Sequence, residues 1–183
     1  VPAEFTAYQG FDALFHSVEC YISAAANLMS DMYALTAIEN IGAYLARAVK
    51  DGSDMEAREH VAFANTLSGV VMTISSCTSE HSMEHAMSAY HHDLPHGAGL
   101  IMISKAYFTY FIEKEPMDFI AALVELQEQC GVADLKMSDY GIKPDEFMTL
   151  AQNARATMGG LFFCDRVLLS DEECAAIFEK AYR

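Results

Sequence analysis

The 183-residue sequence predicts an all-α protein that forms one domain. Apolar residues recur at helical spacing along nearly the whole chain, and alternating strand-like runs are missing. Residues of the types AVILMFWYC make up 52% of the composition, which is enough to fill a core. No repeat, low-complexity segment or linker divides the chain, so we expect residues 1–183 to form a single multi-helix domain.

The first third of the chain predicts three helices. Residues 5–26, rich in alanine and aromatics, form the first. Asp31 is the expected N-cap of the second, which runs to about residue 50 and stops at Gly52. The segment Ser53-Asp54-Met55-Glu56 has the pattern of a capping box and opens a third helix, to about residue 75.

The remaining helices follow from similar signals. Thr78 or Ser79 opens a helix to about residue 90, residues 91–95 turn, and Gly97 starts a long apolar helix to about residue 113. Another helix is expected from Pro116 to about residue 130.

Two helices are expected near the end of the chain. The segment Lys143-Pro144-Asp145-Glu146 begins one of them, because proline suits a first helical turn, and Gly159-Gly160 ends it. The segment Ser170-Asp171-Glu172-Glu173 caps the last helix.

Charge and cysteine content narrow the function classes. Lys and Arg total 11 against 26 Asp and Glu, and the net charge of −15 repels phosphate backbones, which argues against a nucleic-acid partner. No apolar run reaches the ~18 residues of a membrane span, and no signal peptide is present. The five cysteines are scattered without a CxxC pair, so we expect reduced thiols in a cytoplasmic protein.

Histidines and one aspartate carry the chemistry. Five of the seven histidines lie between positions 81 and 96. Asp12 and His16 are four apart on a predicted helix, and His81 and His85 share this spacing, so each pair can face one ion. His96 stands at a helix entrance. Nitrogen and oxygen donors suit a divalent first-row metal, and spacing alone leaves five candidates, one more than most such sites use.

Each pattern alone also has an ordinary explanation. An isolated Asp-x-x-x-His is usually a surface or capping pair. His91, His92 and Asp93 read as solvated turn residues, and His60 reads as part of a polar helix face. The joint occurrence of two helical pairs and a turn histidine favours a metal site.

Two motifs resemble the iron-containing (group III) alcohol dehydrogenases. The run Gly10-Phe-Asp-Ala-Leu-Phe-His-Ser-Val-Glu-Cys-Tyr-Ile-Ser23 resembles the first motif of that family. The run His81-Ser-Met-Glu-His85, followed by Asp93-Leu-Pro-His-Gly97, resembles the second. The resemblance covers about the first 105 residues and implies the helical metal domain of a dehydroquinate synthase-like architecture. The resemblance places only the helical half in this chain, and we expect the amino-terminal dinucleotide-binding domain to lie outside it, since no glycine-rich phosphate-binding turn is found.

The resemblance also implies a role for each residue. The family's metal ligands fall on Asp12, His16, His81 and His96, and His85 is a non-ligand that faces nicotinamide and substrate. The stretch from His85 to His96 is one residue longer than in the commonest members. This leaves His91 and His92 as competitors for the role of His96.

The implied activity is alcohol oxidation to an aldehyde or ketone, or the reverse. Fe²⁺, or Zn²⁺ in some relatives, activates the alcohol oxygen, and hydride passes to NAD or NADP bound mainly by the absent domain. The implied partners are that domain and a small alcohol or aldehyde, and a homo-oligomer is compatible with this account. Because the chain opens Val1-Pro2 without Met, we expect a fragment or processed product that is inactive alone.

The same residues can be compared with four other classes of protein. A zinc-dependent, glycerol-type polyol dehydrogenase has a similar ligand set. An HD-type metal phosphohydrolase is suggested by His92-Asp93, but Asp12-x-x-x-His16 has no place in it. A carboxylate di-iron bundle needs Glu-x-x-His twice, and the chain has none. A non-catalytic helical module is disfavoured because all four apparent ligands are present.

Overall fold

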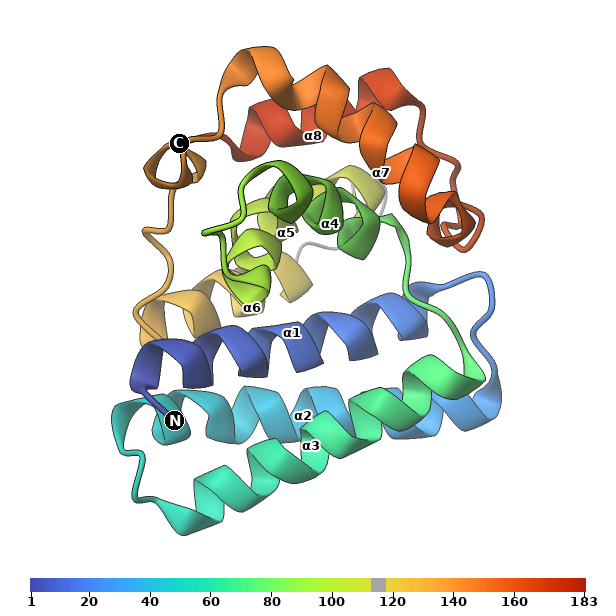
Figure 1. Cartoon of the computed structure of the whole chain (residues 1–183). Helices are drawn as coiled ribbons and strands as arrows, with labels where there is room; N and C mark the ends of the chain where they lie inside the picture. Colours follow the sequence, from blue (N-terminus) through green and yellow to red (C-terminus); the bar gives the residue numbers. More distant parts are fainter. Residues whose placement is uncertain (113–117) are drawn as a thin grey trace.

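The computed structural model describes residues 1–112 and 118–183, and every regular element within these residues is a helix (Figure 1). The all-α prediction is therefore confirmed. In chain order the elements are α1 (Ala3–Ile22), α2 (Leu28–Lys50), α3 (Met55–Ile74), α4 (Ser79–Tyr90), α5 (His96–Ile112), α6 (Asp118–Gln129), the 3₁₀ turns η1 (Met137–Tyr140) and η2 (Pro144–Glu146), α7 (Phe147–Phe162) and α8 (Asp171–Ala181).

Helix α1 lies between two groups of helices. It packs on α2 and α3 along one side and on α5 along the other, while α4 contacts α5 and α7 (Figure 1). Its face toward α5 is apolar, with Phe11 and Phe15 fully buried and Phe15 against Phe108 at 5.9 Å between ring centroids. Burying aromatic side chains of this size is the main favourable term for joining α1 to α5. The polar residues of α1 then face the junction with α4.

Two helix starts differ from the expected ones. Asn27, not Asp31, is the N-cap of α2, and its side chain accepts the backbone N–H groups of Met29 and Ser30 at 3.1 Å. Asp54, not Ser53, caps α3. Several Asx and Ser residues stand near each start, and the residue whose side-chain oxygen reaches the free N–H groups becomes the cap. Helix α1 also ends at Ile22, four residues before the expected end.

Helix α7 differs at both ends. Pro144–Glu146 forms a separate 3₁₀ turn, so α7 begins at Phe147. The chain does not break at Gly159-Gly160. It kinks at Met158 (φ −131°, ψ 36°) and stays helical to Phe162. The Met158 carbonyl accepts the Ser82 hydroxyl at 2.9 Å, so α4 compensates the disturbed hydrogen bonding.

One of the remaining predicted helix ends is confirmed, and two lie in the segment that the structure does not describe. Ser170 caps α8, as predicted. The expected start at Pro116 and end at residue 113 lie outside the described residues.

Within the described residues no single helix is long and apolar enough to cross a membrane. Helices α3 and α4 meet that criterion only as a pair bent by 106°. All five cysteines are free, and four of them are buried, Cys164 being partly exposed.

Candidate metal centre

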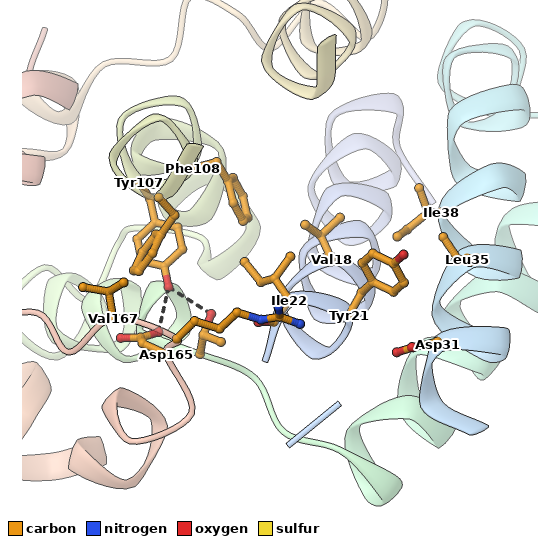
Figure 2. Close-up of a pocket in the computed structure, with 13 residues that line it drawn as sticks. Val18, Tyr21, Ile22, Asp31, Leu35, Ile38, Tyr107, Phe108, Asp165 and Val167 are labelled. Carbon is orange, nitrogen blue, oxygen red and sulfur yellow. Dashed lines mark hydrogen bonds between the residues drawn. The ribbon is translucent and has the colours of Figure 1, made fainter. Parts of the chain in front are cut away.

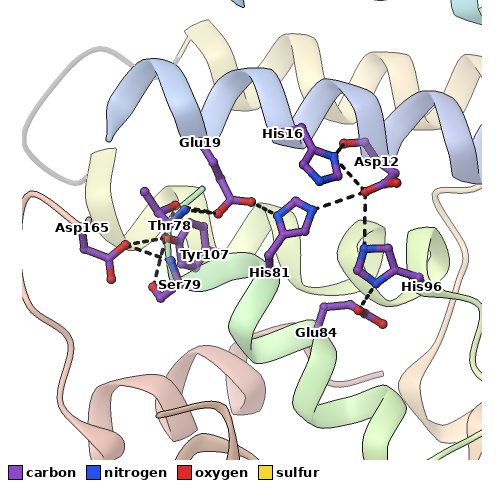
Figure 3. Close-up of polar contacts among 10 residues, drawn as sticks. All are labelled: Asp12, His16, Glu19, Thr78, Ser79, His81, Glu84, His96, Tyr107 and Asp165. Carbon is purple, nitrogen blue, oxygen red and sulfur yellow. Dashed lines mark hydrogen bonds and ion pairs between the residues drawn. The ribbon is translucent and has the colours of Figure 1, made fainter. Parts of the chain in front are cut away.

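Two buried carboxylates hold the first turn of α4 in place. Glu19 of α1 accepts the Thr78 backbone N–H at 2.6 Å and the Thr78 hydroxyl at 2.8 Å. Asp165, from the segment between α7 and α8, accepts the Ser79 N–H at 3.0 Å. Negative groups are favourable at a helix N-terminus, where backbone N–H groups lack helical partners. These contacts fix the position of His81 one turn further on (Figure 3).

The Asp12 carboxylate is the point on which the histidines converge. Its Oδ1 lies 3.3 Å from His81 Nε2, 3.4 Å from His96 Nε2 and 3.2 Å from His16 Nδ1 (Figure 3). The donor atoms of Asp12, His81 and His96 all lie within 4.8 Å of one another. Residues from α1, α4 and the start of α5 therefore meet at one oxygen.

His16 adjoins this point from the side. Its Nδ1 also lies 2.8 Å from the Asp12 main-chain oxygen. A carbonyl only accepts, so Nδ1 carries the proton and Nε2 keeps the lone pair. The ring lies on that of His81, with centroids 4.1 Å apart. His16 shares a second close donor set with Cys77 and His81.

Two further carboxylates orient the histidines. Glu19 accepts the Nδ1–H of His81, and Glu84 accepts the Nδ1–H of His96; both glutamates are fully buried. The Nε2 lone pair of each ring is thereby directed at the Asp12 oxygen. Lone pairs that face an anionic oxygen need a cation between them, either a proton or a metal ion. The donor set therefore fits a divalent metal.

The pKa shifts of Asp12, His81 and His96 agree with a site that binds a cation. Burial alone would raise the pKa of Asp12, but hydrogen bonds from His16, His81 and His96 outweigh it, and the pKa lies well below its usual range. Burial opposes a charge on His81, yet the carboxylates of Glu19 and Asp12 raise its pKa. The pKa of His96 rises to about 9 despite burial, chiefly through its hydrogen bond to Asp12. In the metal-free chain, protons take the place of a cation.

His85 lies beside the cluster on its solvent side. The residue is exposed, and its ring meets that of His96 edge to face at 5.1 Å between centroids. Partial burial and the neighbouring His96 charge lower the pKa of His85. A neutral, accessible imidazole next to the cluster can accept or donate a proton.

The remaining histidines lie elsewhere. His91 Nε2 is 3.2 Å from Glu146, and His92 is exposed in the turn. His60 stacks on Tyr44 at 3.8 Å and contacts Asn40 at 2.6 Å. It is thus His96, rather than His91 or His92, that the structure brings to Asp12.

Glu19 and Glu84 were not among the residues predicted from the sequence. Glu19 is seven residues after Asp12, on the same helix face, and Glu84 is three residues after His81. That spacing is the signal that could have found them. Glutamate on a helix is so often a solvated residue that the spacing alone does not separate a buried carboxylate from a surface one.

Several known proteins are similar to this chain in sequence and in fold. The chain matches the Fe-containing alcohol dehydrogenase family, C-terminal, over residues 6–117. It is 30% identical to 1,3-propanediol dehydrogenase of Klebsiella pneumoniae over 204 residues, covering 99% of this chain and 52% of that enzyme. Alcohol dehydrogenase 4 of Schizosaccharomyces pombe is 30% identical over 200 residues, covering 99% and 46%. The crystal structure of an archaeal halo-thermophilic Red Sea brine pool alcohol dehydrogenase has a TM-score of 0.93 at 29% identity, covering 99% and 51%.

An all-helical fold with a histidine–carboxylate cluster at the junction of three helices defines a helical domain of the alcohol dehydrogenase type. The family match covers more than half of the 183 residues, and the chain therefore belongs to the iron-containing alcohol dehydrogenase family. The resemblance seen in its two motifs is confirmed. The chain spans about half the length of the curated relatives it matches.

Proposed function

We propose that this chain is the metal- and substrate-binding half of an NAD(P)-dependent alcohol dehydrogenase, which oxidises a small alcohol to an aldehyde or ketone or catalyses the reverse. Asp12, His16, His81 and His96 hold the metal, Fe²⁺ or Zn²⁺. The observation that carries the proposal is that His81 Nε2 and His96 Nε2, each held from behind by a buried glutamate, face the same Asp12 oxygen.

Different residues of this chain bind the metal, orient the imidazoles and transfer a proton. A divalent metal bound there supplies Lewis-acid polarisation of the alcohol or carbonyl oxygen. Asp12 contributes a carboxylate that stays ionised at neutral pH, and Glu19 and Glu84 keep the imidazoles in the ligating tautomer. His85, accessible and with a lowered pKa, orients substrate or nicotinamide and takes up or gives a proton.

The dinucleotide is bound mainly by a separate amino-terminal domain in this proposal. A helical domain with net charge −15 offers little attraction for a pyrophosphate. The share of each relative that the chain covers, 52% and 46%, supports a two-part enzyme. A zinc-dependent polyol dehydrogenase remains the alternative, because one carboxylate and three imidazoles suit either metal. An HD-type phosphohydrolase gains no support, because His92 and Asp93 are exposed in the turn.

The test is an activity assay on the protein in which this chain is joined to its cofactor half. With Fe²⁺ or Zn²⁺ supplied, we expect NAD⁺- or NADP⁺-dependent oxidation of small alcohols. His85→Ala should lower turnover and leave the Fe²⁺ content unchanged, whereas Asp12→Asn should lose both turnover and bound Fe²⁺. The isolated 183-residue chain should show no turnover. Full activity of the Asp12→Asn protein, or turnover by the isolated chain, would contradict the proposal.

A further inference from the structure

A second donor set overlaps the first. One ligand atom each from His16, Cys77 and His81 lies within 4.8 Å of the other two. Cys77 stands two residues before α4 and only 6% of it is exposed. His81 therefore belongs both to a nitrogen–oxygen set with Asp12 and His96 and to a nitrogen–sulfur set with His16 and Cys77.

We propose that Cys77 is a further metal ligand of this chain. With His16 and His81 it forms a second, softer position that takes thiophilic divalent ions such as Zn²⁺, Cd²⁺ or Co²⁺. The inference rests on the proposed metal centre, since the two positions share His81 and lie side by side.

The chemistry of the donors separates the two positions. A carboxylate with imidazoles suits Fe²⁺ and Mn²⁺, whereas a thiolate with two imidazoles favours softer ions. Binding at the second position breaks the S–H bond of Cys77, forms a sulfur–metal bond and releases one proton to solvent. His81 Nε2 can serve only one ion, so the positions compete. The identity of the metal then decides whether Asp12 and His96, or Cys77, join His16 and His81 in its shell.

The surroundings of Cys77 favour an uncharged thiol when no metal is bound. Its hydrogen bond with Cys20, its burial and the nearby Glu19 charge all raise the pKa of the Cys77 thiol, so the metal-free group is neutral and unreactive. The same carboxylate attracts a cation to this spot. The competing explanation is packing alone, because Cys77 also contributes with Cys20 and Val71 to a small apolar cluster.

Co²⁺ titration of the 183-residue chain separates these explanations. We expect a thiolate-to-cobalt charge-transfer band in the near ultraviolet and release of about one proton per thiolate bound. Cys77→Ser and Cys77→Ala should abolish the band while keeping the helical circular dichroism. Cys130→Ser is the matched control, since Cys130 is 7% exposed and in no donor set found among the described residues; its band should be unchanged. Asp12→Asn should keep the band, because the second position does not use Asp12.

Other results of the Co²⁺ titration would contradict either the role of Cys77 or the whole metal centre. Visible d–d bands without charge transfer in the wild type would exclude Cys77 as a ligand and leave the Asp12 centre standing. A band that survives in Cys77→Ser would also overturn the proposal. Failure of Co²⁺ to bind at all would overturn both. Should the Cys77 variants not fold, X-ray absorption of the Zn²⁺-loaded wild type decides, with a sulfur ligand expected at about 2.3 Å.

Discussion

Among single residues, Glu19 is a buried carboxylate that contacts both the start of α4 and a histidine of the candidate site. It is fully buried, accepts the Thr78 N–H and hydroxyl, and holds the Nδ1–H of His81. A carboxylate behind a ligating imidazole raises its basicity and fixes its orientation. The residue therefore links the start of α4 to the donor atom of the metal centre.

Replacing Glu19 by Gln should weaken metal binding about 10–100-fold, because a neutral amide orients His81 less firmly and removes a compensating charge. Isothermal titration with Zn²⁺ measures the change. Glu39→Gln, at an exposed position of α2, is the control and should bind as the wild type does. Equal affinities of the two variants would show that Glu19 has no role behind the ligand.

Metal binding and stability should depend on pH in opposite senses. The pKa of His96 is raised from 6.5 to about 9 in the metal-free chain, so its contribution to folding is complete below pH 6.5 and is lost as pH rises toward 9. A metal ion competes with that proton, so metal affinity should rise over the same interval, by at most about tenfold per pH unit for each proton displaced. Thermal melts and Mn²⁺ titrations at several pH values test this, because Mn²⁺ suits the position that includes Asp12 and His96. An affinity independent of pH between 6.5 and 9 would contradict it.

The sequence predicted the candidate donors but not the carboxylates that lie behind them. Asp12 with His16, and His81 with His85, stand out because a four-residue spacing places ligating residues together on one helix face, and His96 stands out by its place at a helix entrance. Glu19 and Glu84 do not stand out, because burial of a glutamate depends on which helix packs over it. Likewise, spacing left His85 among the ligands, and only the family motif separated it from them.

At the scale of elements, the sequence predicted the helices better than their ends. Periodicity and glycine located α2 and α3, but the caps fell on Asn27 and Asp54, because cap choice depends on backbone angles that composition does not reveal. The 159–160 glycine pair suggested a break that the packing of α7 on α4 overrides. Tertiary contacts decided these positions.

The approach of α5 to α1 depends on Gly97. A Cβ there would lie 2.3 Å from the Tyr8 main-chain oxygen, whereas one at Gly42 would meet nothing within 4 Å. Gly97→Ala must therefore push the start of α5, with His96, away from Asp12. We expect a loss of about 1–3 kcal/mol of stability together with weaker metal binding.

Gly42→Ala is the matched control in the interior of α2. It should stabilise the chain by roughly 0.5–1 kcal/mol, because alanine is the better helix former and the site is open. Urea unfolding and Mn²⁺ titration of both variants give the two quantities. A Gly97→Ala chain with unchanged metal affinity would show that α5 does not position His96 through this contact.

At the scale of the whole molecule, large apolar side chains remain on the surface of this half. Leu28 is 90% exposed at the start of α2, and Phe163 is 77% exposed after α7. A cavity of about 670 Å³ lies between α1, α2 and α5, and its lining includes Tyr21, Leu35 and Phe108 (Figure 2). Under the proposed function, we expect part of this exposed apolar surface to pack against the amino-terminal domain.

The central claim is that Asp12, His16, His81 and His96 bind one divalent metal ion. An anomalous difference map from crystals of the 183-residue chain grown with Fe²⁺ tests it most directly. We expect a single strong peak about 2.0–2.2 Å from the Asp12 carboxylate and from the Nε2 atoms of the three histidines, with the His16 ring turned toward the ion. A peak held by His91 or His92, or no peak near Asp12 at saturating metal, would contradict it.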